Sequence, residues 1–197
     1  AGAPSPVELD GTATAMTGDG RGTVFLSTRG GYFRFDAASA DVTKVGVDGQ
    51  EDVDFTAIAR RADGRLVLGS ADGAVYTLSS DTEVGAHLKI FARVDVVVAQ
   101  GNTAVVLDRG QTSVTSLNEE GTNSEHALRA GDGATTMASD GAGRVLVADT
   151  RGGELLVGVL QHQLVDPLGE QLRADLIAAG DSCRLLQDRG LQRLDRE

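Results

Sequence analysis

Two sets of polar residues recur along the chain at regular intervals, and both could bind a ligand. The first set holds small hydroxyl or carboxylate residues spaced 42, 39, 40 and 40 residues apart: Thr14, Thr56, Asp95, Thr135 and Asp175. The second set holds arginines beside glycine-containing turns: Arg29, Arg109, Arg151 and Arg189, with Asp72 as the exception. Hydroxyls and carboxylates can bind polar ligands, whereas the planar guanidinium group suits carboxylates and phosphates.

Each set also has a purely structural interpretation. Thr and Asp at the start of a strand can bond to the local backbone, and an arginine can pair with a neighbouring aspartate such as Asp108 or Asp188. A repeat reproduces structural needs as readily as it reproduces a binding site. The structural interpretation is therefore the default for both sets. The alternative is a channel mouth ringed by guanidinium groups that binds an acidic ligand.

The residues that usually hold metals are too scattered to form a site. His87, His126 and His162 fall on or beside the outermost strand of three successive units, where they splay apart. Zinc needs its ligands to converge to about 2 Å from one ion. Calcium loops of the Asp-x-Asp-x-Asp-Gly kind are missing as well. We expect no metal and no cofactor.

Known catalytic arrangements fit the sequence poorly. Propeller glycosidases need paired carboxylates, and the candidates Asp95 and Asp175 lie two units apart. Cys183 has no histidine nearby to activate it, and no Gly-x-Ser-x-Gly motif is present. We therefore expect a non-catalytic protein. The alternative is a hydrolase or lactonase-like enzyme with its centre at Asp95, Asp175 and the threonines of the first set.

The elements that would position these residues follow from an internal repeat. An apolar column recurs with the same spacing at Met16, Ile58, Val97, Met137 and Ile177. In each unit a short apolar strand leads into a turn such as Asp63-Gly64, and then into a continuous apolar strand, a second glycine turn and two further strands. Four strands in about 40 residues are typical of a β-propeller blade. The sequence thus predicts an all-β propeller of four-stranded antiparallel blades.

The spacing divides residues 1–197, taken as one domain, into about five blades. These span 12–54, 55–93, 94–133, 134–173 and 174–197, and a strand at 6–10 is expected to complete the last blade and close the ring. The alternative is that the chain forms part of a larger ring of about seven blades. In either case the innermost strands line a channel, and both sets of polar residues lie at the same end of it.

Charge and composition restrict the kinds of partner and of structure that we expect. The net charge of −11 repels phosphate backbones, so nucleic acid is not an expected partner. A single cysteine rules out an intrachain disulfide, and no apolar run is long enough to span a membrane. We expect a monomer.

Four segments carry a resemblance to a known family. Residues 22–35, 55–78, 101–115 and 133–156 resemble mycobacterial and related actinobacterial envelope lipoproteins. The resemblance implies a surface-layer-type propeller outside the plasma membrane, in contact with that membrane only through a lipid anchor. It also implies a length sufficient for about seven blades and an acylated cysteine near the mature N-terminus. The one cysteine here is Cys183, and the match fades after residue 158. The expected function is binding of an envelope protein or acidic ligand.

Overall fold

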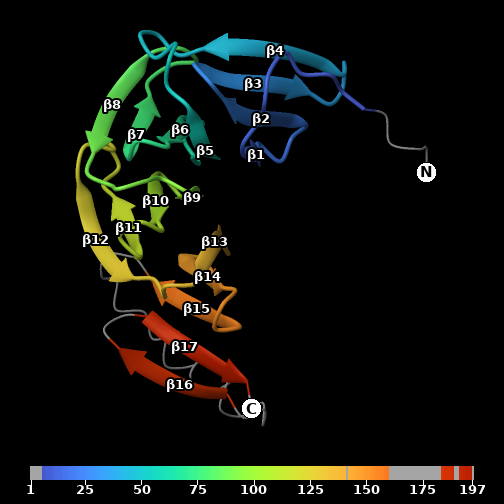
Figure 1. The fold of residues 1–197 in the computed structure, drawn as a ribbon. Coiled ribbons are helices and arrows are strands. Elements are labelled where there is room, and N and C mark those ends of the chain that lie inside the picture. The colour runs from blue at the N-terminus through green and yellow to red at the C-terminus, as the bar shows by residue number, and fades with distance from the viewer. Residues whose placement is uncertain (1–5, 141, 160–182, 189–190, 197) are drawn as a thin grey trace.

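The computed structural model describes residues 6–140, 142–159, 183–188 and 191–196 (Figure 1). Within these ranges all regular secondary structure is β-strand, and every strand pairing is antiparallel. The strands form four sheets, each of which starts from one repeat unit. The predicted all-β fold with four-stranded blades is confirmed.

The first three sheets each contain four strands in chain order. Blade 1 contains β1 (Met16–Gly18), β2 (Thr23–Thr28), β3 (Gly31–Asp36) and β4 (Asp41–Gly46). Blade 2 contains β5 (Phe55–Arg60), β6 (Leu66–Ser70), β7 (Ala74–Leu78) and β8 (Val84–Lys89). Blade 3 contains β9 (Val96–Gln100), β10 (Thr103–Asp108), β11 (Ser113–Leu117) and β12 (Ser124–Arg129).

The fourth sheet has five strands. It contains β13 (Ala134–Ser139), β14 (Arg144–Asp149), β15 (Glu154–Val159), β16 (Cys183–Asp188) and β17 (Leu191–Arg196). The order across this sheet is β13-β14-β15-β17-β16, so β17 pairs with β15 through Leu155↔Leu194. We refer to this sheet as blade 4.

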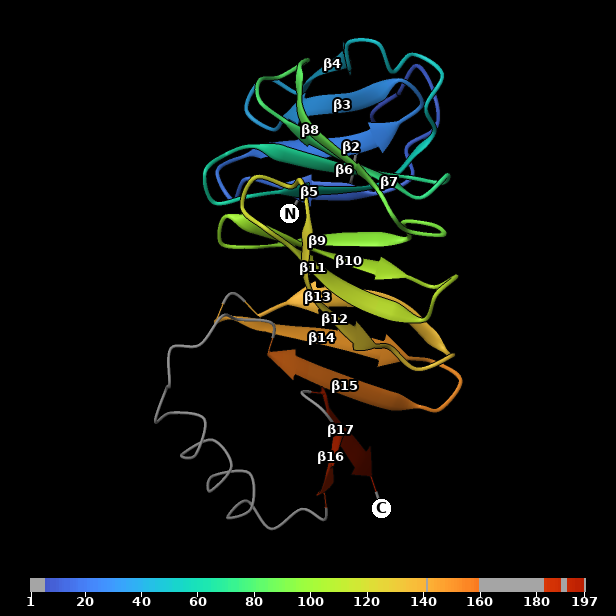
Figure 2. The ribbon, with the colours of Figure 1, turned by 90° about the vertical axis from the view of Figure 1, so that its left-hand side faces the viewer.

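The blades follow one another along an arc. Figure 1 shows β1, β5, β9 and β13 on the concave side and β4, β8 and β12 on the convex side. The innermost strands contact one another in sequence, β1 with β5, β5 with β9, and β9 with β13. Figure 2 shows the same sheets from the side as successive layers. This is the arrangement of a propeller, in which twisted sheets pack face to face around an axis.

Apolar side chains fill each junction between neighbouring blades. Ile58 packs with Tyr32 between blades 1 and 2, Val97 packs with Val67 between blades 2 and 3, and Met137 packs with Leu107 between blades 3 and 4. Both faces of the second strand are buried at these junctions, as Val67 and Leu68 show. The continuous apolar runs in the sequence therefore reflect strands covered on both sides.

The predicted fifth blade differs from the structure. Residues 6–10 belong to no strand, and Val7 is exposed. The strands β16 and β17 pair with each other, and β17 pairs with the edge of β15, so these described strands belong to blade 4 and not to a separate sheet that the N-terminal segment closes. The edge of β15 offers unpaired backbone groups that a hairpin can satisfy. The fourth strand expected for the 134–173 blade, on or beside which His162 falls, lies outside the described residues.

Candidate functional site

The described members of the two predicted sets lie at the same end of the axis that the arc surrounds. Each innermost strand runs antiparallel to the second strand of its blade, so the start of the first strand lies beside the end of the second. The turns between second and third strands, at 29–30, 71–73, 109–112 and 150–153, therefore share an end with Thr14, Thr56, Asp95 and Thr135. We refer to this end as the crown and to the opposite end as the base.

Two threonines of the first set link neighbouring blades. The Thr14 hydroxyl donates a 2.6 Å hydrogen bond to the carbonyl oxygen of Phe55, and the Thr56 hydroxyl donates one of 2.6 Å to that of Val94. In both cases the acceptor belongs to the residue just before the next member of the set. Thr135 instead contacts the Ala148 carbonyl of its own blade at 3.4 Å. For Thr14 and Thr56, the structural interpretation accounts for the hydroxyl.

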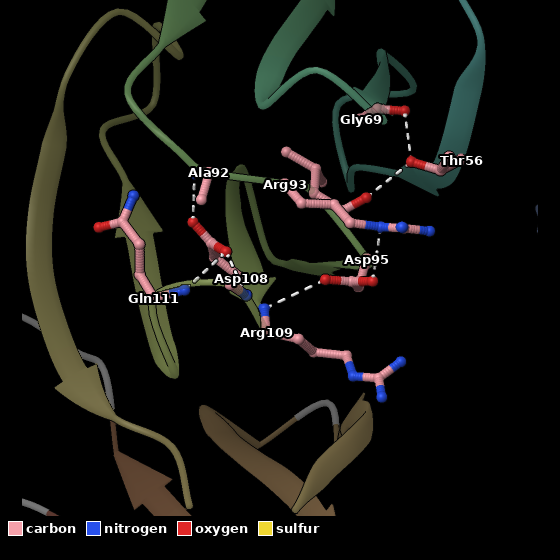
Figure 3. A network of polar contacts seen from close by, with 10 residues as sticks. Thr56, Gly69, Ala92, Arg93, Asp95, Asp108, Arg109 and Gln111 are labelled. Carbon is pink, nitrogen blue, oxygen red and sulfur yellow. Dashed lines mark hydrogen bonds and ion pairs between the residues drawn. The ribbon is translucent and has the colours of Figure 1, made fainter. Parts of the chain in front are cut away.

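Asp95 breaks this pattern because a carboxylate has no proton to donate. It accepts a 3.1 Å hydrogen bond from the backbone N–H of Arg109, and it forms a 3.0 Å ion pair with the Nε of Arg93 (Figure 3). Only 10% of the Asp95 side chain is exposed, which strengthens both contacts. The carboxylate is therefore used to fix the crown of blade 3.

In the crown turns of blades 1 and 2, the charged side chain at the predicted position forms an ion pair. Arg29 forms an ion pair of 2.9 Å with Asp52 and lies 4.0 Å from Asp54. In blade 2 the place of the arginine is taken by Asp72, which pairs with Lys89 at 2.6 Å. The hydrogen bond from Lys89 holds the pKa of Asp72 below its usual value, and the same bond raises the pKa of Lys89.

The crown arginines of blades 3 and 4 have no carboxylate partner among the residues that the structure describes. Figure 3 shows the Arg109 side chain extending away from Asp95, although its backbone N–H points at that carboxylate. No ion pair involves Arg151 within the same ranges, and Arg151 is exposed. These two turns therefore present guanidinium groups that are open to a ligand. Arg189 and Asp175, predicted for the same end, lie outside the described residues.

The neighbouring aspartates do not pair with these arginines, which corrects the structural interpretation considered for Arg109. The fully buried carboxylate of Asp108 accepts hydrogen bonds from the N–H groups of Gly110 (2.8 Å), Gln111 (3.1 Å) and Ala92 (2.6 Å). Asp149 binds its own turn in the same way: it accepts from the N–H groups of Arg151 (3.0 Å), Gly152 (2.9 Å) and Gly133 (3.3 Å). Both aspartates hold the turn backbone rigid and also reach the segment that arrives from the preceding blade.

Sequence reasoning missed Arg93, which lies outside both periodic sets. It sits in the segment between β8 and β9, and its only sequence signal is its position two residues before Asp95. Its guanidinium group belongs to the crown, yet the ion pair with Asp95 partly neutralises it.

The base carries a buried arginine and a shallow hollow. Arg61 is 4% exposed; its Nη1 donates to the carbonyl of Glu119 in blade 3, and its Nη2 pairs with Asp63 at 2.9 Å. The hollow, of about 310 Å³, is lined by 63–66 and 78–81. Its carboxylates already face Arg61, Arg65 and Arg34. The carboxylates that line this hollow, Asp63 and Asp81, are therefore already paired with arginines.

The described part of the chain contains neither a metal-binding cluster nor a membrane-spanning helix. Across the residues that the structure places, no three His, Cys, Asp or Glu side chains come close enough to hold one metal ion. The same part of the chain has no helix of the length and hydropathy needed to cross a bilayer.

Comparison with known proteins extends the description of the fold. No family model matches the chain, and no curated protein sequence matches it significantly. Among solved structures it is similar to hydrazine synthase of Kuenenia stuttgartiensis, with TM-score 0.61, 19% identity, and coverage of 78% of this chain and 47% of that one. The WD40 repeats of RRP9 give TM-score 0.60, 12% identity, and coverage of 78% and 49%. Virginiamycin B lyase of Staphylococcus aureus gives TM-score 0.53, 15% identity, and coverage of 64% and 45%.

The chain spans about half the length of these three structures. They include enzymes as well as WD40 repeats, so the same blade architecture carries unrelated functions. At these identities the similarity shows the fold alone: the chain has the blades of a β-propeller.

Proposed function

We propose that this protein is a non-catalytic binding propeller of the cell envelope that recognises an acidic segment of an envelope protein through its crown. The location outside the plasma membrane, held by a lipid anchor, rests on the resemblance of 22–35, 55–78, 101–115 and 133–156 to actinobacterial envelope lipoproteins. The mode of binding rests on the arrangement of charges at the crown.

The observation that carries the proposal is the contrast among the four crown turns. Those of blades 1 and 2 are compensated by Asp52 and Lys89, whereas Arg109 and Arg151 in the adjacent blades 3 and 4 have no carboxylate partner in the described ranges. The backbone of both turns is fixed by Asp108 and Asp149, so the two guanidinium groups start from rigid supports. Guanidinium groups bind carboxylates through paired donors.

The acidic charge of the whole protein restricts how such a partner is recognised. A net charge of −11 repels an acidic segment at long range, so attraction must come from groups within about one Debye length of the crown, roughly 8 Å at physiological salt. Arg109 and Arg151 meet this condition for a segment that lies across blades 3 and 4. Nucleic acid carries a far higher charge density and is not proposed as a partner.

The non-catalytic part of the proposal is supported by the structural contacts that already occupy the candidate nucleophiles and acids. The hydroxyls of Thr14 and Thr56 donate to backbone carbonyls, and the Asp95 carboxylate is bound by Arg93 and by the Arg109 N–H. A hydrolase or lactonase centred on these groups would have to break the threonine contacts that join neighbouring blades or the Asp95 contacts that fix the crown of blade 3.

The proposal is tested with a fluorescent peptide of glutamates as the probe. We expect wild-type protein to bind it and the double variant Arg109→Ser/Arg151→Ser to bind at least about tenfold more weakly. The matched control is Arg65→Ser, which removes an arginine from the base. Equal binding by wild type and the double variant, or no binding by wild type, would exclude the crown as an acidic-ligand site. Envelope location is tested separately by fractionating cells: recovery of the native protein in the cytosol would contradict it.

A further inference from the structure

Among the described residues, no blade packs on the face of blade 1 that points away from blade 2, whereas blades 2, 3 and 4 each pack on a preceding blade on the corresponding side. The residues Ile58, Val97 and Met137 occupy one column and pack on the preceding blade, with exposures of 4%, 5% and 6%. Met16 occupies the same column in blade 1 and is 73% exposed. Burial of such an exposed methionine is favourable, so this face is a surface that association would stabilise.

Two further apolar side chains lie on the same face of blade 1 as Met16. Strand register places Leu26 opposite Met16 and Phe33 opposite Leu26, which puts all three on one side of the sheet. The ring of Phe33 is buried beneath the segment at Gly11, whereas Leu26 is only half-buried. The face is thus partly covered by the N-terminal segment and open at its inner strand.

The complementary face lies at the other end of the same chain. In blade 4 Leu156 is opposite Val147 and faces blade 3, so Leu155 points to the other side of the sheet, where it is 40% exposed. The register makes Leu155 the counterpart of Tyr32, the residue just before Phe33 in blade 1. Tyr32 belongs to the cluster that buries Ile58. Met16 therefore corresponds to Ile58, and Leu155 corresponds to Tyr32. Inside the chain, Ile58 and Tyr32 are buried on the two sides of the junction between blades 1 and 2.

We propose that a second copy of this chain covers both faces, with blade 1 of each copy packed on blade 4 of the other around a two-fold axis along the channel. One copy carries both halves of the junction on an open arc (Figure 1), and a two-fold arrangement joins both pairs and leaves no half exposed. Equivalent surfaces already pack on each other at the internal junctions, and this favours a copy of this chain as the occupant. This proposal differs from the monomer expected from the sequence.

Charge adds a condition to the assembly. Each copy carries −11, so the copies repel each other and salt should tighten the pair by screening that repulsion. A contact held by ion pairs would show the opposite trend.

The experiment is sedimentation equilibrium of the 197-residue protein, from about 1 to 100 µM, at low and high salt. We expect a mass twice 20.4 kDa that persists at high salt, and at least about tenfold weaker association for Met16→Lys and for Leu155→Lys. The matched control is Ile90→Lys, which replaces a 47% exposed apolar residue away from both faces and should leave the pair intact. Circular dichroism of each variant separates loss of association from loss of folding.

Mixing the two variants provides an internal check. In a mixed pair one junction keeps both native residues and the other carries both substitutions, whereas in a pair of either variant alone each junction carries one substitution. Because one buried charge is already enough to open a junction, the mixture should associate more tightly than either variant alone. A monomer at every concentration, unaffected association of both variants, or open-ended growth beyond two copies would each overturn the proposal. These results are independent of whether the crown binds an acidic peptide.

Discussion

The hydroxyl of Thr14 lies 2.6 Å from the carbonyl oxygen of Phe55, although 41 residues separate them in the chain. Thr56 repeats this bond to Val94 one blade further on. The recurring threonine that looks like a ligand-binding position in the sequence therefore joins one innermost strand to the next.

Removing this hydroxyl should weaken the junction without changing its shape. We expect Thr56→Val to lower the free energy of unfolding by about 1 to 2 kcal/mol, because the buried Val94 carbonyl loses its donor. Thr56→Ser should recover most of the loss, and Thr43→Val on the exposed face of β4 should change stability by less than about 0.5 kcal/mol. Urea denaturation measures all three. If valine and serine behaved alike at position 56, the bond would have no energetic role.

The buried carboxylate of Asp108 should be more sensitive than an exposed one. Asp108→Asn keeps one acceptor oxygen but replaces the other with an amide that cannot accept from the N–H groups of the turn, so we expect a loss of about 2 to 3 kcal/mol. The matched control is Asp132→Asn, whose side chain is largely exposed and which should cost less than about 0.5 kcal/mol. Thermal unfolding followed by circular dichroism compares them, and equal effects would contradict the assigned role.

Two glycines with positive φ should differ sharply in their tolerance of a side chain. Gly73 has φ +87° and a Cβ added there would overlap the Phe91 carbonyl, whereas Gly20 has φ +69° and nothing within 4 Å. We expect Gly20→Ala to cost about 1 to 2 kcal/mol from backbone strain alone. Gly73→Ala should cost more, because the loop between blades 2 and 3 must also move. Chemical denaturation of both variants checks the order, and a smaller effect at Gly73 would refute it.

Alkaline pH should destabilise the protein through Tyr32. Burial, assisted by the negative charge of Asp81, raises the pKa of Tyr32 to about 12. In the unfolded chain the tyrosine hydroxyl ionises near pH 10. The contribution of neutral Tyr32 to the free energy of unfolding is therefore fully present below pH 10 and is lost as the pH rises through 12. Two pKa units correspond to at most about 2 to 3 kcal/mol.

Tyr32→Phe tests this account. The variant should be about 1 kcal/mol less stable at neutral pH, since the hydroxyl donates to the Asp81 carbonyl at 3.0 Å, and should lose less stability between pH 10 and 12. Some alkaline loss should remain, because burial also raises the pKa of Tyr76. An unchanged pH profile of the free energy of unfolding would show that Tyr32 is not the titrating group.

The fold was predictable because one short pattern repeats. The column of Met16, Ile58, Val97 and Met137 sets the spacing of the blades, and aspartate-glycine turns such as Asp19-Gly20 set the hairpins. Local chemistry determines both features. The last sheet was not predictable, since the pairing of β17 with β15 depends on a competition for one free edge that no local pattern encodes.

The candidate site was only partly predictable. Sequence alone places Arg109 and Arg151 at the crown, but whether a guanidinium group is free depends on contacts from other segments, such as that of Asp52 with Arg29. Periodicity could not identify Arg93, which lies in a connecting segment, or decide which of Arg60 and Arg61 is buried.

Asp95 has a consequence for the order in which the blades unfold. A hydrogen bond donated by a threonine hydroxyl links blade 1 to blade 2 and blade 2 to blade 3. At the corresponding position of blade 3, the Asp95 carboxylate instead binds Arg93 and the backbone N–H of Arg109, and neither group belongs to blade 4. In a repeat protein, where each unit contacts only its neighbours, unequal junctions divide the chain into cooperative units of different stability. Blades 1 to 3 then form one unit, and amide protons of β13 and β14 should exchange with solvent before those of β5 and β6.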